Sequence, residues 1–462
     1  MNLKVTIENV GVIKNAGIQL GGLTVLCGKN NTGKTYVTHS IFGILNRLQK
    51  IAGAPILEKI VIPADRDGVF ELPESTFFTI LQESVDRISA DAPSVLSDVL
   101  ASGKKRFADS KVSLEILAAK EVMSSKMSFS TPVGNMSFGI SKVSTGMCRV
   151  VSSWTENGDS AEAGAVKRLD VYKKIIRRQC ATQIQAQYFP RTFICSAERT
   201  GAGIFQKELD FTRSRLIDLM SKTRVSKIDP YDMVDKFVAE YPLAVRTDVD
   251  FIRNLSVLSK RRGKWAMENG EILELFANIV GGNYIAQDGD MRFAPIVSIA
   301  DVEALKLSES SSSVRALMDM AGYLKHIIRR GDLLIVDEPE MNLHPENQRK
   351  VARLFASLVN TGVNVFITTH SDYLMRELNL LVLLKGKTAS SRKLAEKYGY
   401  KSQQLLDASN LHIYKTEDDP AGMGLKTISG IVVSQDSGVA SSVFDDTINE
   451  MNRISDDIYW GE

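Results

Sequence analysis

Residues 28–35 read Gly28-Lys29-Asn30-Asn31-Thr32-Gly33-Lys34-Thr35. This stretch matches GxxxxGK[ST] in full, and it stands between a predicted strand, residues 23–26, and a predicted helix, residues 35–50. Glycines let backbone amides curl around phosphate oxygens, and a helix N-terminus adds positive potential. All eight residues are candidate nucleotide-binding residues, with Lys34 predicted to act catalytically on the outer phosphates and the Thr35 hydroxyl to ligate Mg²⁺. The alternative is an ordinary Gly/Asn turn, which the flanking strand and helix disfavour.

A second element, residues 333–336, is an apolar strand that ends in two acids, Asp337 and Glu338. A central strand would deliver Asp337 to the sheet edge beside the phosphate loop, where it can hold Mg²⁺ directly or through water. Glu338 is then the candidate catalytic base for the water that attacks the γ-phosphate. Taken alone, two acids could simply end a strand, but the phosphate loop in the same chain favours the metal and catalytic roles.

A third element, residues 364–368, is another apolar strand, and it is followed by Thr369 and His370. A lone histidine is usually a packed or surface residue. Here it follows the Asp337-Glu338 strand by one helix and one strand, so the imidazole is predicted to hydrogen-bond the γ-phosphate as a catalytic residue and to respond to its loss.

The composition sets bounds on the rest. The chain has 462 residues, about three times the commonest domain size, which indicates several domains or one large domain with insertions. At 44% hydrophobic and 24% charged it is typical of a soluble globular protein, and the net charge of +2 gives no global field for nucleic acid or membranes. Nothing resembles a leader or a membrane span, so we predict a cytoplasmic protein with no membrane partner. The spacing of the four cysteines and five histidines disfavours a disulfide or a structural metal site.

Strands and helices alternate in the second half of the chain, which predicts an α/β fold with a parallel sheet. Helices are predicted at 161–187, through most of 205–279, and at 314–330 and 345–360; a strand is predicted at 3–9 and another at 191–195. Short strands are predicted around 126–151, and a hairpin at 283–295 that turns at Asp288-Gly289. The predicted organisation is a P-loop lobe at 1–200 with a mixed insertion at 51–190, a helical lid and hairpin at 201–297, and a third lobe at 298–462.

The order of these motifs, with Asp337-Glu338-Pro339-Glu340-Met341-Asn342-Leu343-His344-Pro345 between them, resembles the ABC-type ATPase heads of the RecF, SMC and OLD group. It looks most like the stand-alone ATPases of bacterial anti-phage systems, such as the Septu, PARIS and retron-associated ATPases. The resemblance covers residues 1–45 and roughly 190–462. It implies an ABC-type head with a mixed insertion and a helical lid, and ATP with Mg²⁺ held between two heads of a homo-oligomer.

The same resemblance implies a signature motif supplied by the partner head, for which the candidate is residues 307–315, with Ser311, Ser312 and Ser313 as nucleotide contacts. These serines replace the glycines of LSGGQ, and a Ser-rich helix cap is the alternative. Residues 342–345 would signal between the two sites. Residues 196–201 would take the place of the Q-loop, although Glu198 and Arg199 stand where a glutamine is usual, and Gln206 is a weaker candidate for that contact.

Two basic runs are either solvated surfaces or phosphate-contacting patches for nucleic acid or an acidic partner. They are Lys167, Arg168, Lys173, Lys174, Arg177 and Arg178, and Lys260, Arg261, Arg262 and Lys264. Trp265, beside the second run, could stack on a base or belong to the core.

Three functions compete for this chain. The first, which we favour, is an ATP-hydrolysing switch of an anti-phage system that senses infection and controls a separately encoded effector, a nuclease or toxin. The chain itself shows no nuclease constellation, because Asp418-Asp419 and Asp445-Asp446 are predicted to lack the strand context of a metal site. The second is a RecF-like DNA-repair ATPase. The third, a transporter subunit, is disfavoured by the long insertions and the absence of LSGGQ.

Overall fold

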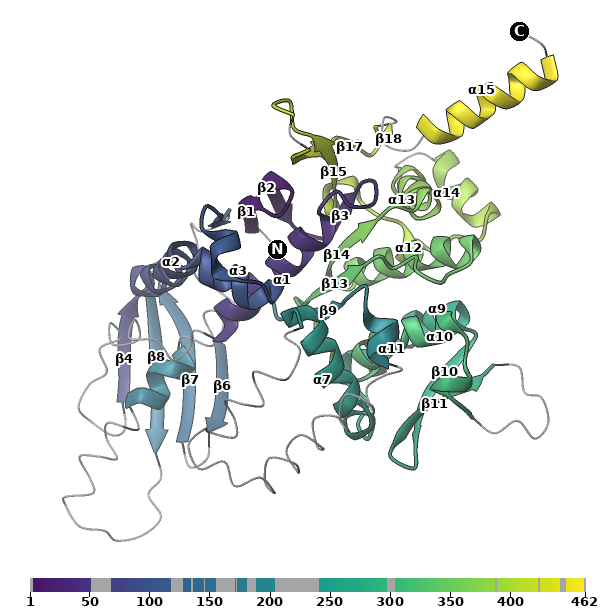
Figure 1. Cartoon of the computed structure of the whole chain (residues 1–462). Helices are drawn as coiled ribbons and strands as arrows, with labels where there is room; N and C mark the ends of the chain where they lie inside the picture. The colour runs from purple at the N-terminus through teal and green to yellow at the C-terminus, as the bar shows by residue number, and fades with distance from the viewer. Residues whose placement is uncertain are drawn as a thin grey trace, which may run out of the picture.

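In the computed structural model of the protein, the described residues form an α/β fold around one large sheet, which confirms the predicted fold class (Figure 1). The structure describes residues 3–50, 68–117, 128–133, 136–144, 146–154, 171, 173–180, 188–203, 241–296, 304–386, 389–422, 424–440 and 446–460. The division into three lobes stays a prediction.

The large sheet has nine strands in the order β5-β1-β2-β16-β15-β3-β14-β13-β9. The five neighbouring strands from β15 to β9 are all parallel. They are β3 (Leu23–Cys27), β9 (Thr192–Cys195), β13 (Leu333–Asp337), β14 (Asn364–Thr369) and β15 (Leu411–Asp418). Four of these strands were predicted from the sequence and are confirmed. The fifth, β15, was not predicted.

Alternate residues of the parallel strands belong to two different cores. Leu333 and Ile335 of β13 pack in the core that contains the apolar face of α1 (Lys34–Lys50). Leu334 and Val336 pack in the other core, with α12 (Pro345–Asn360) and α13 (Asp372–Leu384). The sheet is therefore covered on both faces, as expected of parallel strands with apolar residues throughout. The predicted helices at 35–50 and 345–360 are confirmed.

Four more strands extend the sheet beyond β15; their pairings are antiparallel except that β16 and β2 are parallel. They are β1 (Leu3–Val10), β2 (Ile13–Leu20), β5 (Lys111–Ile116) and β16 (Lys426–Ile431). The predicted strand at 3–9 is confirmed, but β2 was missed. Lys14, Asn15 and Gly17 give this segment weak strand propensity, and its apolar alternation is completed only by pairing with β1 along nearly its whole length.

The insertion after α1 carries a second, four-stranded antiparallel sheet in the order β4-β8-β7-β6. Its strands are β4 (Gly68–Pro73), β6 (Ser128–Val133), β7 (Met136–Ser144) and β8 (Met147–Trp154), and helices α2 (Glu74–Ala90) and α3 (Ala92–Leu100) lie between β4 and β5 in the chain. This confirms the predicted strands around 126–151. Of the predicted helix at 161–187, residues 173–180 are helical, and most of the remainder lies outside the described residues.

Helices and a small sheet cover the edge of the large sheet near β9. They are α7 (Leu243–Leu258), α8 (Lys264–Glu268), α9 (Gly270–Val280), β10 (Gly282–Gln287), β11 (Asp290–Pro295) and β12 (Leu305–Lys306). The predicted hairpin is confirmed. Gln287 pairs with Asp290, and Asp288 and Gly289 have φ of 54° and 80°, as a tight turn between these strands requires.

The prediction of one helix over residues 314–330 was wrong. The chain forms three short pieces instead: α10 (Ser312–Ala316), α11 (Met318–Gly322) and a π-helical turn (Tyr323–Ile327). The first break has a visible cause. The Ala316 carbonyl accepts a hydrogen bond from Arg199, and the Met320 amide, its partner in a continuous helix, donates to the Asp319 carboxylate at 2.7 Å.

The C-terminal part adds α14 (Ala389–Lys397), β17 (Val433–Ser434), β18 (Gly438–Val439) and α15 (Asp446–Trp460), which projects from the rest (Figure 1). One expectation here was wrong: Asp418 is the last residue of β15, so it does have strand context. Asp418 pairs with Lys426, and Asp419 pairs with Lys14 at 3.0 Å.

In the part of the chain that the structure describes, no helix is both long and apolar enough to cross a bilayer. Single 3₁₀ turns lie at Lys104–Phe107, Leu307–Glu309, Ser402–Gln404 and Ala408–Asn410.

The packing of α1 on α3 can be tested at Gly43. Replacing a helical glycine by alanine ordinarily gains about 1 kcal/mol. Here the new Cβ would overlap the methyl groups of Val99, lying 2.6 Å from Cγ1, and overpacking costs about 1–3 kcal/mol. We expect Gly43→Ala to lower the melting temperature in thermal denaturation. The melting temperature of the double variant Gly43→Ala/Val99→Ala should be higher than the sum of the two single effects predicts, because the smaller side chain of Val99→Ala makes room for the new Cβ. A Gly43→Ala protein that melts above the wild type would contradict this packing.

Candidate functional site

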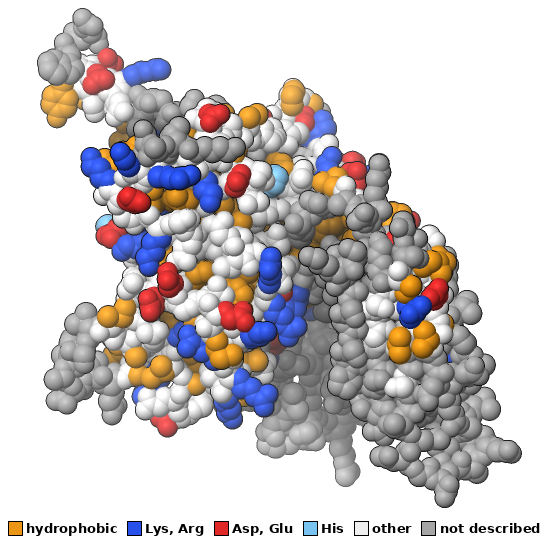
Figure 2. Space-filling model, turned by 180° about the vertical axis from the view of Figure 1, so that it is seen from behind, with side chains coloured by type: hydrophobic (Ala, Val, Ile, Leu, Met, Phe, Trp, Pro, Cys, Tyr) orange, Lys and Arg blue, Asp and Glu red, His pale blue; other side chains and the backbone are white. Residues whose placement is uncertain are grey.

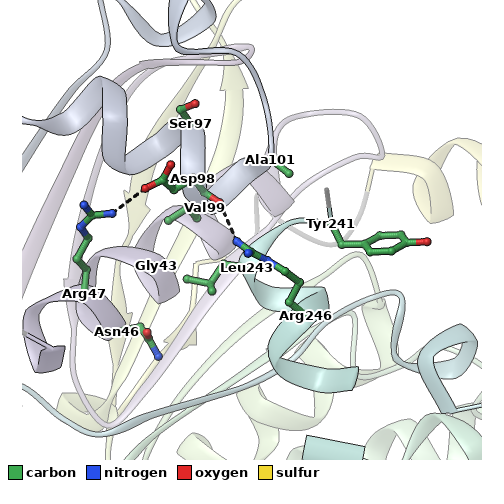
Figure 3. A pocket seen from close by; sticks show the side chains of 10 residues that line it. All are labelled: Gly43, Asn46, Arg47, Ser97, Asp98, Val99, Ala101, Tyr241, Leu243 and Arg246. Carbon is green, nitrogen blue, oxygen red and sulfur yellow. Dashed lines mark hydrogen bonds and ion pairs between the residues drawn. The ribbon is translucent and has the colours of Figure 1, made fainter. Parts of the chain in front are cut away.

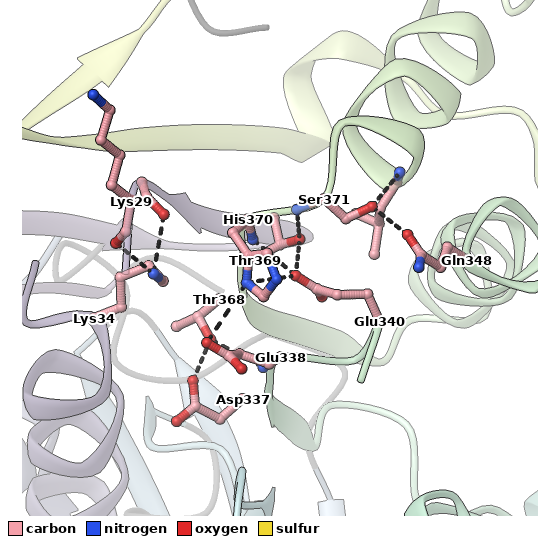
Figure 4. Close-up of polar contacts among 12 residues, drawn as sticks. Lys29, Lys34, Asp337, Glu338, Glu340, Gln348, Thr368, Thr369, His370 and Ser371 are labelled. Carbon is pink, nitrogen blue, oxygen red and sulfur yellow. Dashed lines mark hydrogen bonds and ion pairs between the residues drawn. The ribbon is translucent and has the colours of Figure 1, made fainter. Parts of the chain in front are cut away.

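The phosphate loop and the predicted residues Asp337, Glu338 and His370 come from different parts of the chain and meet at one edge of the sheet. Because β3, β14, β13 and β9 are parallel, their carboxyl ends lie at the same edge. The phosphate loop follows β3, Asp337 ends β13, His370 follows β14, and residues 196–201 follow β9. Figure 4 shows Lys34, Asp337, Glu338 and His370 facing a common space at this edge.

The phosphate loop depends on backbone conformations that side chains rarely adopt. Gly28 and Gly33 have φ of 155° and 87°, and a Cβ on Gly28 would overlap the Thr416 hydroxyl. The Lys34 ammonium folds back over the loop and donates to the carbonyls of Gly28 at 3.0 Å and Lys29 at 2.9 Å. Left-handed glycines and a lysine folded over the loop are the conformation that the GxxxxGK[ST] pattern predicts.

The Thr368 hydroxyl joins the two acids at the end of β13. It donates to Asp337 Oδ1, and it accepts a hydrogen bond from the Glu338 amide at 3.1 Å. Glu338 itself has φ of 50°, a left-handed conformation that is strained for a residue with a Cβ. Asp337 is 1% exposed, whereas the Glu338 side chain is 29% exposed, so these neighbouring carboxylates occupy different surroundings.

A third acid, Glu340, organises the histidine loop. Its Oε1 accepts from the Thr369 hydroxyl and from the His370 amide, both at 2.8 Å. The His370 Nδ1 lies 3.4 Å from Glu340 Oε1 and 3.6 Å from Glu338 Oε1. The imidazole is therefore held between two carboxylates, with nearly half of the side chain open to solvent.

Arg199, in the segment that follows β9, is buried beneath these acids. Its guanidinium makes four hydrogen bonds, all to backbone carbonyls. Nε donates to Ala316 at 2.8 Å, Nη1 donates to Ser196 at 2.8 Å and Asp337 at 2.7 Å, and Nη2 donates to Glu338 at 2.8 Å. One side chain thus joins the end of β9, the broken helix and both residues of the acidic pair.

Two buried aspartates accompany this arginine. Asp248 of α7 accepts from the Ser196 amide at 2.8 Å, and Asp319 accepts from the Met320 amide. Burial, and next the charge of Asp319, raise the pKa of Asp248 well above its usual value. Burial likewise raises the pKa of Asp319, while the charge of Arg199 lowers it. A second buried oxygen on each aspartate has no hydrogen-bond partner among the described residues.

Four further residues lie at this edge without having been predicted to take part in the site: His39, Glu340, Thr368 and Thr416. His39 of α1 is buried, which lowers its pKa, while the charges of Asp337 and Glu198 act in the opposite direction. Thr416 hydrogen-bonds Thr32 in the phosphate loop at 2.9 Å. Glu340 and Thr368 belong to motifs that were recognised, and their polarity beside apolar strands was an available signal. No local pattern marks His39 or Thr416.

Other candidates do not join this group. Ser311 caps α10 by accepting from the Val314 amide, and its hydroxyl lies 2.8 Å from that of Ser313. Among the described residues, no hydrogen bond joins these serines to the phosphate loop. Trp265 is buried in the core, so it is not a base-stacking surface residue. Gln206, Lys167 and Arg168 lie outside the described residues.

The acidic edge fits a magnesium ion. Mg²⁺ prefers oxygen ligands, and it commonly binds one or two carboxylates together with substrate phosphates. Asp337 Oδ2 is buried and has no hydrogen-bond partner among the described residues, which leaves one oxygen of this carboxylate available to a cation or its water. Thr35 is exposed at the start of α1. The assignment of Thr35 and Asp337 as ligands stays a prediction.

A separate pocket of about 590 Å³ lies between α1, α3 and the start of α7 (Figure 3). Arg47 pairs with Asp98 at 2.9 Å there, and Arg246 donates to the Asp98 carbonyl at 3.3 Å. The pocket meets α1 from Gly43 onward, beyond the phosphate loop, and none of the predicted site residues lines it. It is therefore distinct from the acidic edge.

Comparisons with known proteins find ATPase similarity over part of this chain. A family model described as "AAA ATPase domain" matches residues 210–375. The chain is 32% identical over 101 residues to the "Uncharacterized ABC transporter ATP-binding protein YhaQ" of Bacillus subtilis (strain 168), a match that covers 21% of this chain and 33% of that protein. The chain thus spans about a third of the length of this curated relative.

Solved structures with a similar course of the chain include heads of SMC proteins. A SmcHead bound to the C-winged helix domain of ScpA has a TM-score of 0.36 at 12% identity, with 92% of this chain and 97% of that chain covered. The SMC head domain from Thermotoga maritima has a TM-score of 0.26 at 12% identity, with 94% and 100% covered. These likenesses are too loose to describe the site. The phosphate loop, the ATPase-domain match and the ATP-binding relative together support an ABC-type P-loop ATPase.

The buried aspartates predict a pH dependence of stability. Folding raises the pKa of such a carboxyl, so its contribution to the free energy of unfolding is fully present below the pKa of the unfolded state. That contribution is lost as the pH rises toward the pKa of the folded state, by up to about 1.4 kcal/mol per pH unit. Asp248→Asn keeps an oxygen for the Ser196 amide and removes the titration. We expect the melting temperature of Asp248→Asn minus that of the wild type, measured by thermal denaturation at each pH, to increase from pH 5 to pH 8. A difference that shrinks with rising pH would contradict this.

Proposed function

We propose that this protein is an ATP-hydrolysing molecular switch whose heads pair around two bound nucleotides. The observation that carries the proposal is the meeting, at one sheet edge, of the phosphate loop with Asp337, Glu338 and His370. These residues come from strands that are far apart in sequence, and a nucleoside triphosphate with its cation matches their chemistry: curled amides and an ammonium for phosphates, and carboxylates for a metal and a water.

Each residue has a role in this proposal. Lys34 leaves its loop carbonyls to bind the outer phosphates, and the amides of residues 28–35 surround the remaining oxygens. Glu338, the more exposed of the two acids, accepts a proton from the attacking water. His370 hydrogen-bonds the γ-phosphate, and Glu340 orients its loop. Mg²⁺, held by Thr35 and Asp337, would neutralise phosphate charge as it builds up.

The support for pairing of heads is the surface position of the signature candidate. Ser311 and Ser312 are exposed at the start of α10, where Ser311 is the N-cap residue. A second copy would place these serines against the nucleotide of the first, which makes the protein a homo-oligomer in its ATP-bound state. Because α10 is connected through Arg199 to the acidic pair, pairing and hydrolysis are linked within each head.

The biological role we propose is anti-phage defence. The switch senses infection and controls a separately encoded effector, a nuclease or toxin. The support is the Glu198-Arg199 pair in place of the Q-loop glutamine, which resembles the defence ATPases more than the transporters. Over the described surface in Figure 2, basic and acidic side chains are interspersed, which suits protein partners better than a long nucleic acid.

The alternative is a RecF-like ATPase that binds DNA. Its support is the second basic run, where Lys260, Arg261 and Arg262 are all exposed on the turn between α7 and α8. A cluster of this size could contact a few phosphates. The neighbouring Trp265 does not add a stacking surface, because it is buried.

Hydrolysis is tested by changing the two central residues. We expect Lys34→Ala to weaken ATP binding and Glu338→Gln to lower kcat at least about a hundredfold with ATP binding retained, because only the second change leaves the phosphate loop intact. The readouts are phosphate release and binding of a fluorescent ATP analogue. Lys350→Ala and Glu346→Gln, which remove an ion pair on α12, are the matched controls and should keep wild-type rates. Unchanged hydrolysis in Glu338→Gln would refute the proposal.

The two biological roles give opposite results. In the defence role, expression with the neighbouring open reading frame lowers phage plating efficiency. Glu338→Gln abolishes that protection, whereas a triple change of Lys260, Arg261 and Arg262 to serine keeps it. In the RecF-like role, the purified chain binds gapped duplex with a steep salt dependence, and the triple change reduces the slope by about 0.9 for each lost phosphate contact. Strong binding of this kind without protection would replace the defence proposal.

A further inference from the structure

Arg199 has an unusual set of partners for a buried arginine. It is 1% exposed, yet its four hydrogen bonds go to carbonyl oxygens instead of a carboxylate. Two of these carbonyls belong to the consecutive residues Asp337 and Glu338. A guanidinium holds its donors in a rigid plane, so it sets the relative positions of the groups it binds, which a flexible ammonium on one nitrogen cannot do.

The Glu338 peptide is the part of the site that most needs such support. Its left-handed φ of 50° is a conformation that a residue with a Cβ adopts only when its surroundings impose it. Three hydrogen bonds hold it here. Thr368 accepts from the Glu338 amide at 3.1 Å, and the Glu338 carbonyl accepts from Arg199 at 2.8 Å and from the Met341 amide at 3.2 Å. These hydrogen bonds fix the backbone from which the Glu338 carboxylate projects, and Arg199 supplies the one made by a charged side chain.

The same guanidinium reaches the helix that carries the signature candidate. Its Nε donates to the Ala316 carbonyl, the last residue of α10, and this contact accompanies the break between α10 and α11. A displacement of α10 would therefore be transmitted to the Glu338 peptide through one rigid planar group. The distance from the Ala316 contact to the Glu338 contact is the span of a single guanidinium.

We propose that Arg199 is a positioning residue that holds the Glu338 carboxylate in its working direction and makes that direction depend on the position of α10. The inference rests on the proposed ATP hydrolysis. In this proposal Arg199 stands where other heads have the Q-loop glutamine, but it contacts backbone carbonyls, whereas the glutamine contacts the metal. Arg199 acts through Glu338, without touching the nucleotide.

A simpler explanation is charge balance. Asp248 and Asp319 are both buried near Arg199, and removing a buried counter-charge is destabilising in itself. The two explanations differ in what restores activity. If Arg199 only balances charge, another cation should serve, or the loss of Asp319 should compensate for the loss of Arg199. If it positions Glu338, neither change should restore the rate.

The test compares Arg199→Lys with Arg191→Lys. Arg191 lies just before the same strand, β9, and is bound to Asp332 at 2.7 Å and to the Ile327 carbonyl, at the opposite end of the sheet from the acidic pair. Both changes keep the charge and remove a planar fork. We expect Arg199→Lys to lower kcat roughly tenfold or more, with KM and the stoichiometry of ATP-analogue binding within about threefold of wild type. Arg191→Lys should lower the melting temperature while kcat stays within about threefold.

Two further variants make the result specific. In a Glu338→Gln background, Arg199→Lys should cause no additional loss of kcat, because the group that it positions is already gone. Arg199→Met/Asp319→Asn should raise the melting temperature above that of Arg199→Met without restoring kcat. Wild-type kcat in Arg199→Lys, recovery of kcat in the double variant, or a change confined to KM would each overturn the inference. If the wild-type protein itself releases no phosphate from ATP, it is the proposed function that fails.

Discussion

The site depends on the parallel pairing of β3, β14, β13 and β9. The carboxyl ends of parallel strands lie along one edge of the sheet, so the strand pairing alone brings together the residues that follow them. Apolar side chains on both faces of these strands, packed against α1 on one side and α12 and α13 on the other, hold the edge rigid. The phosphate loop and the acidic pair are consequences of that arrangement, because each is the continuation of a fully buried strand.

Burying so many polar groups at one edge requires that they satisfy one another. Thr368 hydrogen-bonds both Asp337 and Glu338, and Glu340 accepts hydrogen bonds from the loop that carries His370. Arg199 donates to four carbonyls. An unsatisfied buried donor or acceptor costs about 1–3 kcal/mol, so each of these contacts restrains the geometry of the site as well as stabilising the fold. The buried oxygens of Asp337 and Glu340 that lack partners among the described residues stand out against this background.

Local patterns predicted much of the architecture correctly. The phosphate loop, α12 and the β10–β11 hairpin each follow from residues within a short window: glycines beside a strand, a proline at the first helical turn, and Asp288-Gly289 between alternating strands. The failures have a common cause. β2 is stabilised by its neighbours rather than by its own propensity, and the helix predicted at 314–330 is broken by hydrogen bonds from Arg199 and to Asp319, which no helical pattern contains.

The sequence by itself determined which residue types are available for chemistry and which strands carry them, because those signals are local in the chain. Only the tertiary structure decided which of these residues act together. Thr416 meets Thr32 across 384 positions, and Arg199 meets Ala316 and Glu338 across more than a hundred. The reason is physical: the parallel sheet brings distant strand ends together, and contacts between them are set by packing and by the need to satisfy buried polar groups, neither of which is written in any short stretch of sequence.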